Sequence, residues 1–281
     1  VYSYVMHYIV PMENKTTRCP WVNLNNPLYI AYHDREWGKP LHDDRGHFEL
    51  LTLEGAQAGL SWEIVLNKRE NYRQLFCNFD PKLVAKFNDK KIAALLNNPG
   101  IIRNRLKIAS TVINAQAFCK IQREFSSFDN YIWSFINHTP IINKFTALAD
   151  YPSSTPLSDK ISKDLKKRGF KFVGSTIIYA YMQAAGLVND HVLDCCKRWK
   201  VYMVRGKDGS LYTGITTDIT RRLQQHNNQD GAGAKYLRGK VPCVLVYQED
   251  AGDKSSASKR EAEIKKMSKT TKELLCHLTR V

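Results

Sequence analysis

Apolar residues recur at the spacing of three to four positions that is typical of helices through most of the first 198 residues. Asp80 and the proline after it predict the start of a helix over 81–87. A second helix is predicted over 89–96. The run Asn-Asn-Pro-Gly at 97–100 ends it, and a long helix is expected over 102–121.

Two more helices are predicted before residue 199. Ser158 is expected to cap a helix over 159–168, which Gly169 ends. A glycine and a serine at 174–175 open an apolar helix that ends at Gly186. Strand patterns are scarce in this part of the chain, so the pattern predicts an all-α domain.

The pattern changes at Trp199, where β-rich segments begin. Two short strands are predicted over 200–205 and 210–214, joined by a Lys-Asp-Gly turn that is typical of a hairpin. A third strand is predicted over 241–248. The second domain is therefore expected to contain a three-stranded sheet.

Three helices accompany these strands. Asp218 is expected to cap the first, the second is predicted over 257–267, and a Thr-Thr-Lys-Glu capping box at 270–273 predicts the last. The order β-β-α-β-α-α describes a small α/β module. The predicted division of the chain is an N-terminal extension at 1–17, a helical domain at 18–198 and an α/β domain at 199–281.

The 281 residues suffice for two domains that each bury a core. No stretch approaches the roughly 18 consecutive apolar residues of a membrane span. The apolar segment 1–12 is short and has neither a basic start nor a cleavage site, so we do not expect it to be a targeting signal. The seven cysteines are unevenly spaced, so we expect no disulfide framework. Reduced thiols favour a cytoplasmic protein, and the lack of an apolar span predicts no membrane partner.

The charge balance points to a polyanionic partner. The chain carries 42 Lys and Arg against 27 Asp and Glu, a formal net charge of +15. Of these, 26 basic and 18 acidic residues precede Trp199, and 16 and 9 follow, so both domains are basic. The commonest polyanionic partner is nucleic acid, and the alternative is a basic surface that serves only solubility.

Four residues form a candidate zinc site: Cys19, His33, His191 and Cys195. Because His191 and Cys195 are four positions apart, one helical turn would direct both side chains to the same side. Two thiolates and two imidazoles make the closed tetrahedral shell of a structural zinc site. The alternative from spacing alone is a set of unconnected core residues.

Aromatic residues and one carboxyl gather in the same part of the chain, at Trp21, Tyr29, Tyr32, Trp37, Glu54 and Trp62. A hydrophobic core is one explanation, and the one favoured for Trp37. Glu54 lies in the apolar run Leu-Glu-Gly-Ala-Gln-Ala-Gly-Leu at 53–60. A buried carboxylate is costly unless it is paired or functional, so Glu54 is a candidate functional residue.

Long strings around these residues carry a family resemblance. They are Arg-Cys-Pro-Trp at 18–21, Tyr-His-Asp-Arg-Glu-Trp-Gly at 32–38, Glu-Gly-Ala-Gln-Ala-Gly-Leu-Ser-Trp at 54–62, and the runs at 68–73, 162–174 and 186–191. The region from about 18 to 196 resembles the DNA-3-methyladenine glycosylase I family. The resemblance implies hydrolysis of the N-glycosidic bond of 3-methyladenine in alkylated double-stranded DNA, with zinc bound by the four cysteines and histidines named above.

The resemblance also assigns roles within the site. Trp21 and Trp62 are expected to stack on the damaged base, and Tyr32 and Glu54 to bind its edge by hydrogen bonds. Because 3-methyladenine in DNA is cationic, its glycosidic bond is already weak and its leaving group departs neutral. The negative charge of Glu54 is expected to favour this cation over normal adenine.

The resembled family has a helix-hairpin-helix fold, and the hairpin would lie at 98–103. Backbone N–H groups at Gly100 and the charges of Arg103, Arg105 and Lys107 are expected to contact DNA phosphates. No aspartate occurs between Gly100 and Asp129, where many proteins of this fold place a catalytic one. The resembled family also lacks that residue.

A second constellation lies in the α/β domain: Tyr202, Tyr212, Arg222, His226 and Glu261. Such residues could converge on a phosphodiester, with Arg stabilising charge and Glu holding one divalent ion. Tyrosines in strands are also common packing residues. The strings at 201–205, 211–216 and 221–226 make the segment 199–279 resemble the GIY-YIG nuclease superfamily, in its small stand-alone form.

That resemblance implies that Tyr202, Tyr212, Arg222 and His226 are catalytic and that Glu261 binds Mg²⁺. The name motifs are changed to Val-Tyr-Met and Tyr-Thr-Gly, so nuclease activity is the less secure expectation. The expected protein is a DNA-repair glycosylase, cytoplasmic and held at the nucleoid by DNA, whose second domain could cleave DNA near the excision site. The alternatives are a second domain that only binds DNA, and a wholly non-catalytic DNA-binding protein.

Overall fold

The computed structural model describes residues 17–228 and 232–278. Apart from Thr17, the predicted extension at 1–17 lies outside the described residues. The chain separates into two compact units, one formed by 20–192 and one that contains 193–278. The predicted pair of a helical domain and a small α/β domain is confirmed.

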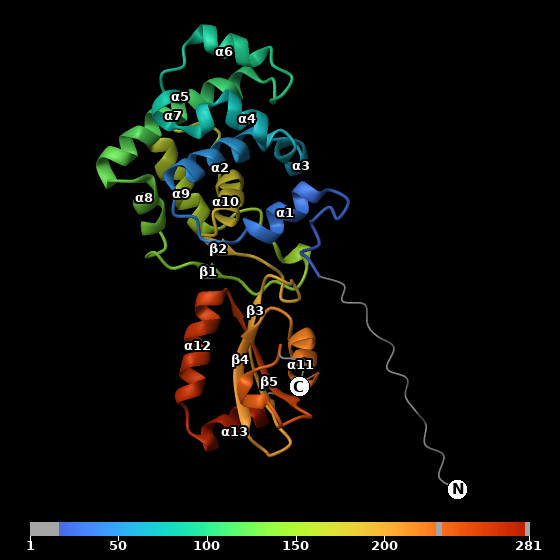
Figure 1. The fold of residues 1–281 in the computed structure, drawn as a ribbon. Coiled ribbons are helices and arrows are strands. Elements are labelled where there is room, and N and C mark those ends of the chain that lie inside the picture. Colours follow the sequence, from blue (N-terminus) through green and yellow to red (C-terminus); the bar gives the residue numbers. More distant parts are fainter. Residues whose placement is uncertain (1–16, 229–231, 279–281) are drawn as a thin grey trace. The chain divides into compact units, whose positions relative to one another are not determined.

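The helical unit is built from ten α-helices in the described residues, two short 3₁₀ turns and one pair of two-residue strands (Figure 1). The helices are α1 (Pro27–Arg35), α2 (Asp44–Gln57), α3 (Trp62–Leu66), α4 (Arg69–Leu75), α5 (Pro81–Val84), α6 (Asp89–Leu96), α7 (Arg105–Phe125), α8 (Phe128–Ser134), α9 (Pro156–Lys167) and α10 (Ser175–Ala184). The 3₁₀ turns are η1 (Cys77–Phe79) and η2 (Leu148–Asp150). The strands β1 (Ile141–Ile142) and β2 (Val188–Asn189) pair in parallel, so the unit is helical but not purely so.

Helix α2 lies in the core of this unit, and residues 47–56 along it are all buried. Phe48 packs against Phe118 of α7, whose ring stacks on Phe128 of α8 at a centroid distance of 4.2 Å. Two acidic side chains of α2, Glu49 and Glu54, are buried with these apolar residues. The cost of burying them has to be offset locally, which makes their partners informative.

Two predicted helix starts were wrong because a nearer side chain makes the cap. Helix α7 begins at Arg105 instead of 102, since the Asn104 side chain accepts a hydrogen bond from the Lys107 amide at 3.1 Å. Helix α9 begins at Pro156, and its cap is Thr155 instead of Ser158. Thr155 and Ser158 form a reciprocal capping box, with the Ser158 amide donating to Oγ1 of Thr155 at 3.1 Å.

The α/β unit holds a three-stranded antiparallel sheet in the order β4-β3-β5, as the sequence predicts. Its elements are β3 (Trp199–Arg205), β4 (Leu211–Thr216), α11 (Ile219–Asn227), the 3₁₀ turn η3 (Lys235–Leu237), β5 (Val244–Gly252), α12 (Lys254–Lys266) and α13 (Lys269–Leu278). Alternate residues of β3 face opposite sides of the sheet. Val201 and Met203 pack with Ala257 and Ile264 of α12, and Tyr202 and Val204 pack with Leu237 and Leu223 on the other side.

The starts of β5, α12 and α13 and the ends of β4 and β5 differ from the predictions. Strand β5 begins at Val244 instead of 241, and the proline at 242 has no N–H to give to a strand ladder. Helix α12 begins at Lys254 instead of 257, because the Asp253 side chain accepts from the Ser256 amide at 2.8 Å. Helix α13 begins at Lys269, where the Ser268 hydroxyl accepts from the Thr271 amide, so the predicted box at 270–273 is not its cap.

None of the helices within 17–228 and 232–278 combines the length and the apolar character that crossing a membrane requires.

Candidate functional site

A cavity of about 260 Å³ opens among the helices of the first unit. Its lining includes all four predicted base-binding residues, Trp21, Tyr32, Glu54 and Trp62. Trp37, which the sequence favours as a core residue, also lines it, although the side chain is buried. The volume is several times that of a water molecule, about 30 Å³ in the liquid, and leaves room for a flat heterocycle.

Aromatic rings form the walls of this cavity. The rings of Tyr32 and Trp62 lie 5.1 Å apart, and those of Trp21 and Trp37 lie 4.7 Å apart, centroid to centroid. The indole N–H groups of Trp21 and Trp62 are buried and have no hydrogen-bond partner. An unsatisfied buried donor costs about 1–3 kcal/mol, so two of them in one cavity indicate a place for a ligand.

The two buried acidic residues of α2 have different surroundings. The Glu49 carboxylate accepts from Arg69 at 2.6 Å and from Arg73 at 2.9 Å, so two guanidinium groups neutralise its charge. Glu54 has no such cation among the residues that the structure describes, and burial raises its pKa from 4.5 to about 8. The cavity thus contains one carboxyl group that a bound cation would stabilise as the carboxylate.

Burial also raises the pKa of Tyr32 well above its ordinary value, and the charge of Glu54 adds to the effect. Tyr32 therefore stays a neutral phenol that can both donate and accept a hydrogen bond. Together with the unpaired indole N–H groups, it gives the cavity donors and acceptors as well as stacking surfaces. This combination is suited to a planar, nitrogen-rich molecule with a positive charge.

Sequence reasoning missed part of the lining. Gln57 lies three residues after Glu54 on α2, and this helical spacing could have shown that both face one side. Ala180 and Gln183 come from α10, and the other lining residues that the sequence did not indicate are Leu148, Tyr151 and Pro152. Tyr29, which the sequence placed in the aromatic cluster, lines the cavity as well. The sequence contains no local pattern that connects these distant segments with Glu54.

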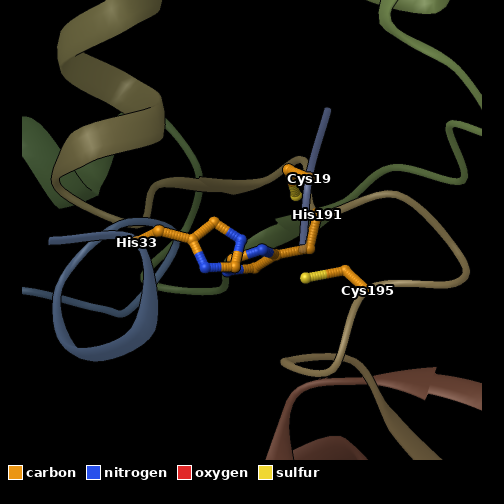
Figure 2. Close-up of side chains that lie close together, drawn as sticks. All are labelled: Cys19, His33, His191 and Cys195. Carbon is orange, nitrogen blue, oxygen red and sulfur yellow. The ribbon is translucent and has the colours of Figure 1, made fainter. Parts of the chain in front are cut away.

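The four predicted zinc ligands come together (Figure 2). Their potential ligand atoms, two sulfurs and two ring nitrogens, all lie within 4.8 Å of one another, and all four residues are buried. Their segments meet as predicted, but 191–195 forms an irregular turn instead of a helix. Gly38 packs on this cluster. Its φ is +71°, and a Cβ added at this position would lie only 3.1 Å from the His191 ring, so a larger residue would crowd the cluster.

Hydrogen bonds fix the ring orientation of both histidines. Nδ1 of His33 lies 2.7 Å from the Asp34 carboxylate, and Nε2 of His191 lies 3.2 Å from the carbonyl oxygen of Trp37. Because both partners are acceptors, each of these nitrogens carries the proton. The lone pairs therefore lie on Nε2 of His33 and Nδ1 of His191, an arrangement typical of metal-binding histidines.

The predicted DNA-binding segment connects α6 with α7. The Gly100 amide donates to Oδ1 of Asn98 at 2.8 Å, so it is engaged within the turn. The Lys107 ammonium donates to the carbonyl oxygens of Ala56 and Ala58, at 2.8 and 2.6 Å, at the C-terminal end of α2. Arg103 and Arg105 are exposed and present their charges to solvent.

In the α/β unit, Tyr202 and Tyr212 lie on adjacent strands, and their ring centroids are 6.4 Å apart. The phenol oxygen of Tyr202 lies 2.8 Å from Nε2 of His226. The Ala234 amide donates to Nδ1 of His226 at 3.2 Å, so the proton of this imidazole lies on Nε2 and points to Tyr202. Burial, with the nearby charge of Arg222, lowers the pKa of His226 to about 4, which keeps the ring neutral.

The remaining predicted residues of this site influence Tyr202. Burial raises its pKa to about 12, while a hydrogen bond from Arg222 lowers it and the charge of Glu261 raises it. Arg222 also donates to Gln225 at 3.0 Å, and Glu261 forms an ion pair with Lys265 at 2.8 Å. The five predicted residues thus belong to one cluster. Tyr202, Tyr212 and His226 are near one another, and Arg222 and Glu261 influence the pKa of Tyr202.

The two folds and their sites define the class: a two-domain protein with an aromatic-walled cavity that contains the buried Glu54 carboxyl, and a second cluster of tyrosine, arginine and histidine in the α/β unit. Residues 21–198 match the family described as methyladenine glycosylase, and residues 198–273 match the GIY-YIG catalytic domain. The chain belongs to the methyladenine glycosylase family and carries a GIY-YIG domain after it.

Each of the relatives described next covers one of the two parts. DNA-3-methyladenine glycosylase 1 of Escherichia coli K12 is 52% identical over 179 residues, which span 64% of this chain and 95% of that protein. A UPF0213 protein of Serratia proteamaculans is 56% identical over 77 residues, 27% of this chain and 74% of that protein. A crystal structure of a 3-methyladenine DNA glycosylase I variant in complex with 3-methyladenine superposes with a TM-score of 0.59 at 37% identity, covering 60% of this chain and 91% of that one.

Proposed function

We propose that the helical domain carries out base-excision repair by hydrolysing the N-glycosidic bond of 3-methyladenine in alkylated double-stranded DNA. The observation that carries this proposal is the buried, unpaired Glu54 carboxyl in a cavity walled by indole rings. The relatives named for this activity support it at 52% identity.

The chemistry follows from the charge of the lesion. A 3-methylated adenine in DNA is a cation, and it leaves as a neutral base, so no strong acid catalyst is needed. The cavity has to hold the base outside the helix, at a cost of a few kcal/mol for unstacking and unpairing. Stacking on Trp21 and Trp62, hydrogen bonds to Tyr32 and attraction to the Glu54 carboxylate offset this cost for the cation and less so for normal adenine.

Duplex DNA would be held by the segment between α6 and α7, in the manner of a helix-hairpin-helix. The exposed side chains of Arg103 and Arg105 support this part of the proposal. Lys107 would contribute mainly to the structure, because its ammonium already binds two carbonyl oxygens. Gly100 would act by permitting the turn, since its amide is bonded to Asn98 and a Cβ there would lie 2.8 Å from the Asn98 side chain.

The cluster of Cys19, His33, His191 and Cys195 fits a structural Zn²⁺ ion. Two thiolates and two imidazoles with oriented rings form the donor set that this ion prefers, and all four side chains are buried. Bound there, zinc would crosslink the segments around residues 19 and 195 to α1. It would take no part in the cleavage.

The test is release of the free base. Duplex DNA treated with a methylating agent is incubated with the protein, and the supernatant is analysed by liquid chromatography. Free 3-methyladenine should accumulate with time, and untreated DNA should release no base. Binding of methylated and untreated DNA without release of any base would support the non-catalytic alternative instead.

For the α/β domain we propose a metal-dependent DNA endonuclease that acts near the abasic site left by excision. The observation in its favour is the donation from His226 and Arg222 to Tyr202, because these donors would stabilise the Tyr202 phenolate, which can take a proton from the attacking water and becomes the phenol. Glu261 would hold Mg²⁺, which supplies charge stabilisation to the phosphodiester. Tethering places this domain at high effective concentration near the excision product.

This second activity is tested on an abasic duplex with Mg²⁺. Glu261→Ala should abolish nicking. Glu263→Ala, two residues further along α12 and 62% exposed at its side chain, is the matched control and should nick like the unaltered protein. Retention of the duplex with no nick would favour a domain that only binds DNA.

A further inference from the structure

Helix α10 presents Ala180 and Gln183, one helical turn apart, to the cavity that contains Glu54. The side-chain nitrogen of Gln183 donates to Oδ2 of Asp190 at 2.8 Å. Since a carboxylate can only accept hydrogen bonds, the NH₂ end of Gln183 is committed to Asp190. The carbonyl end of the same amide is then turned away from Asp190.

Asp190 is held firmly enough to fix this orientation. It is fully buried, and its carboxylate also accepts from the Tyr179 hydroxyl at 2.6 Å and from the Asn143 amide at 2.7 Å. Its backbone oxygen accepts from the hydroxyl of Tyr151, which lines the same cavity, at 2.7 Å. Four donors from three segments, two of them on α10, therefore converge on one residue.

From this geometry we infer that Gln183 is a further base-reading residue, whose side-chain oxygen accepts a hydrogen bond from the exocyclic amino group of the bound base, and that Asp190 is its positioning residue. The inference rests on the proposed function and adds a source of specificity to it. A 6-amino purine offers a donor to this oxygen, whereas a 6-oxo purine offers an acceptor and leaves it unpaired. Because an unpaired acceptor costs free energy, the site should bind the 6-oxo purine less tightly than the 6-amino purine.

The first variant is Gln183→Met, which keeps the length of the side chain and removes its amide. Binding of free 3-methyladenine and of free 3-methylguanine is measured by quenching of tryptophan fluorescence. Loss of one hydrogen bond should weaken the binding of 3-methyladenine about five- to tenfold and leave the binding of 3-methylguanine nearly unchanged. Gln116→Met, at an exposed glutamine of α7, is the matched control. The ratio of the two affinities is independent of the fraction of protein that is folded.

The second variant is Asp190→Asn, whose new NH₂ group can donate to the oxygen of Gln183 and reverse the amide. It should lower the affinity ratio as Gln183→Met does, and the double variant should show no further loss. Melting temperature and metal content report whether the neighbouring His191 is disturbed.

The outcomes separate the two proposals. If the unaltered protein releases 3-methyladenine from methylated DNA but Gln183→Met keeps the original affinity ratio, the inference about Gln183 is wrong and the proposed function stands. If the unaltered protein neither binds nor releases 3-methyladenine, the proposed function is wrong and this inference is wrong with it.

Discussion

The phenol of Tyr202 occupies the space beside Gly214 on the neighbouring strand: a Cβ added at Gly214 would lie 2.7 Å from the Tyr202 oxygen. Tyr202 and Gly214 are direct cross-strand partners between β3 and β4. A side chain at position 214 would occupy the space of the Tyr202 ring, so the glycine of the Tyr-Thr-Gly motif is needed there. Its lack of a side chain allows the Tyr202 hydroxyl to reach His226.

We predict that Gly214→Ala destabilises the α/β domain by about 1–3 kcal/mol, because an extra methyl group in a packed site forces the ring to shift. The shift should also reduce any nicking of abasic DNA. Thermal unfolding followed by circular dichroism measures the first effect. Gly174→Ala is the control substitution, since a Cβ there meets nothing within 4 Å, and its effect should be limited to a few tenths of a kcal/mol, because the N-cap of α10 prefers Gly over Ala.

The buried carboxyl of Glu54 should make stability depend on pH. Its pKa is about 8 in the folded protein and near 4.5 when unfolded, so between these values folding takes up a proton. Stability should therefore fall as pH rises from about 4.5 to 8, on the order of 1.4 kcal/mol for each pH unit at most. Above pH 8 this loss is complete.

Glu54→Gln removes the titrating group, so its melting temperature should exceed that of the unaltered protein at pH 8 and match it near pH 4. Glu70→Gln, at a carboxyl 69% exposed, is the matched control and should follow the unaltered protein at every pH. Parallel pH profiles for the unaltered protein and Glu54→Gln would show that Glu54 is not a buried acid.

The order of elements and the members of the sites could largely be predicted from sequence, because caps, turns and long family strings are local signals. Asp80 and Asp218 cap helices as predicted, at α5 and α11. The start of α9 could not be placed as well, because Thr155 and Ser158 are both good capping residues and only their reciprocal bonds decide between them. Such a choice depends on geometry that composition does not contain.

The cavity-lining residues that could be predicted from sequence all lie between Trp21 and Trp62, and none of those later in the chain was predicted. Gln183 and Tyr151 reach the cavity through the folding of distant segments, and hydrogen bonds to Asp190 hold them there. Trp37 was the harder case, because it is both buried like a core residue and a part of the cavity wall. Burial and function do not exclude each other, and a sequence pattern alone cannot separate them.

Removal of metal should loosen the helical domain. We predict that the purified protein contains about one equivalent of zinc and that Cys195→Ser loses it, with a fall in melting temperature of several degrees, because structural zinc contributes directly to folding. Elemental analysis by mass spectrometry gives the metal content. Cys196→Ser is the matched control, since Cys196 lies outside the cluster, and it should keep both zinc and stability.

The exposed arginines should affect how DNA binding depends on salt. Arg103→Ala and Arg105→Ala should each weaken binding of duplex DNA regardless of sequence and lower the slope of log affinity against log salt by about 0.9 for each lost phosphate contact. Fluorescence anisotropy at several salt concentrations measures this slope. Lys120→Ala, exposed on α7 about 22 Å further along the helix than Arg105, should leave it unchanged. An unaltered slope in both arginine variants would place the DNA on another surface.

The most direct measurement of the whole account is the single-turnover rate at which Glu54→Gln releases 3-methyladenine from methylated duplex DNA. We predict a rate about ten- to a hundredfold below that of the unaltered protein, with DNA affinity retained and a melting temperature at pH 6 that is no lower than that of the unaltered protein, because the substitution removes a charge-assisted contact to the cationic base. Release by Glu54→Gln at the rate of the unaltered protein would contradict the claim that this carboxylate selects the lesion.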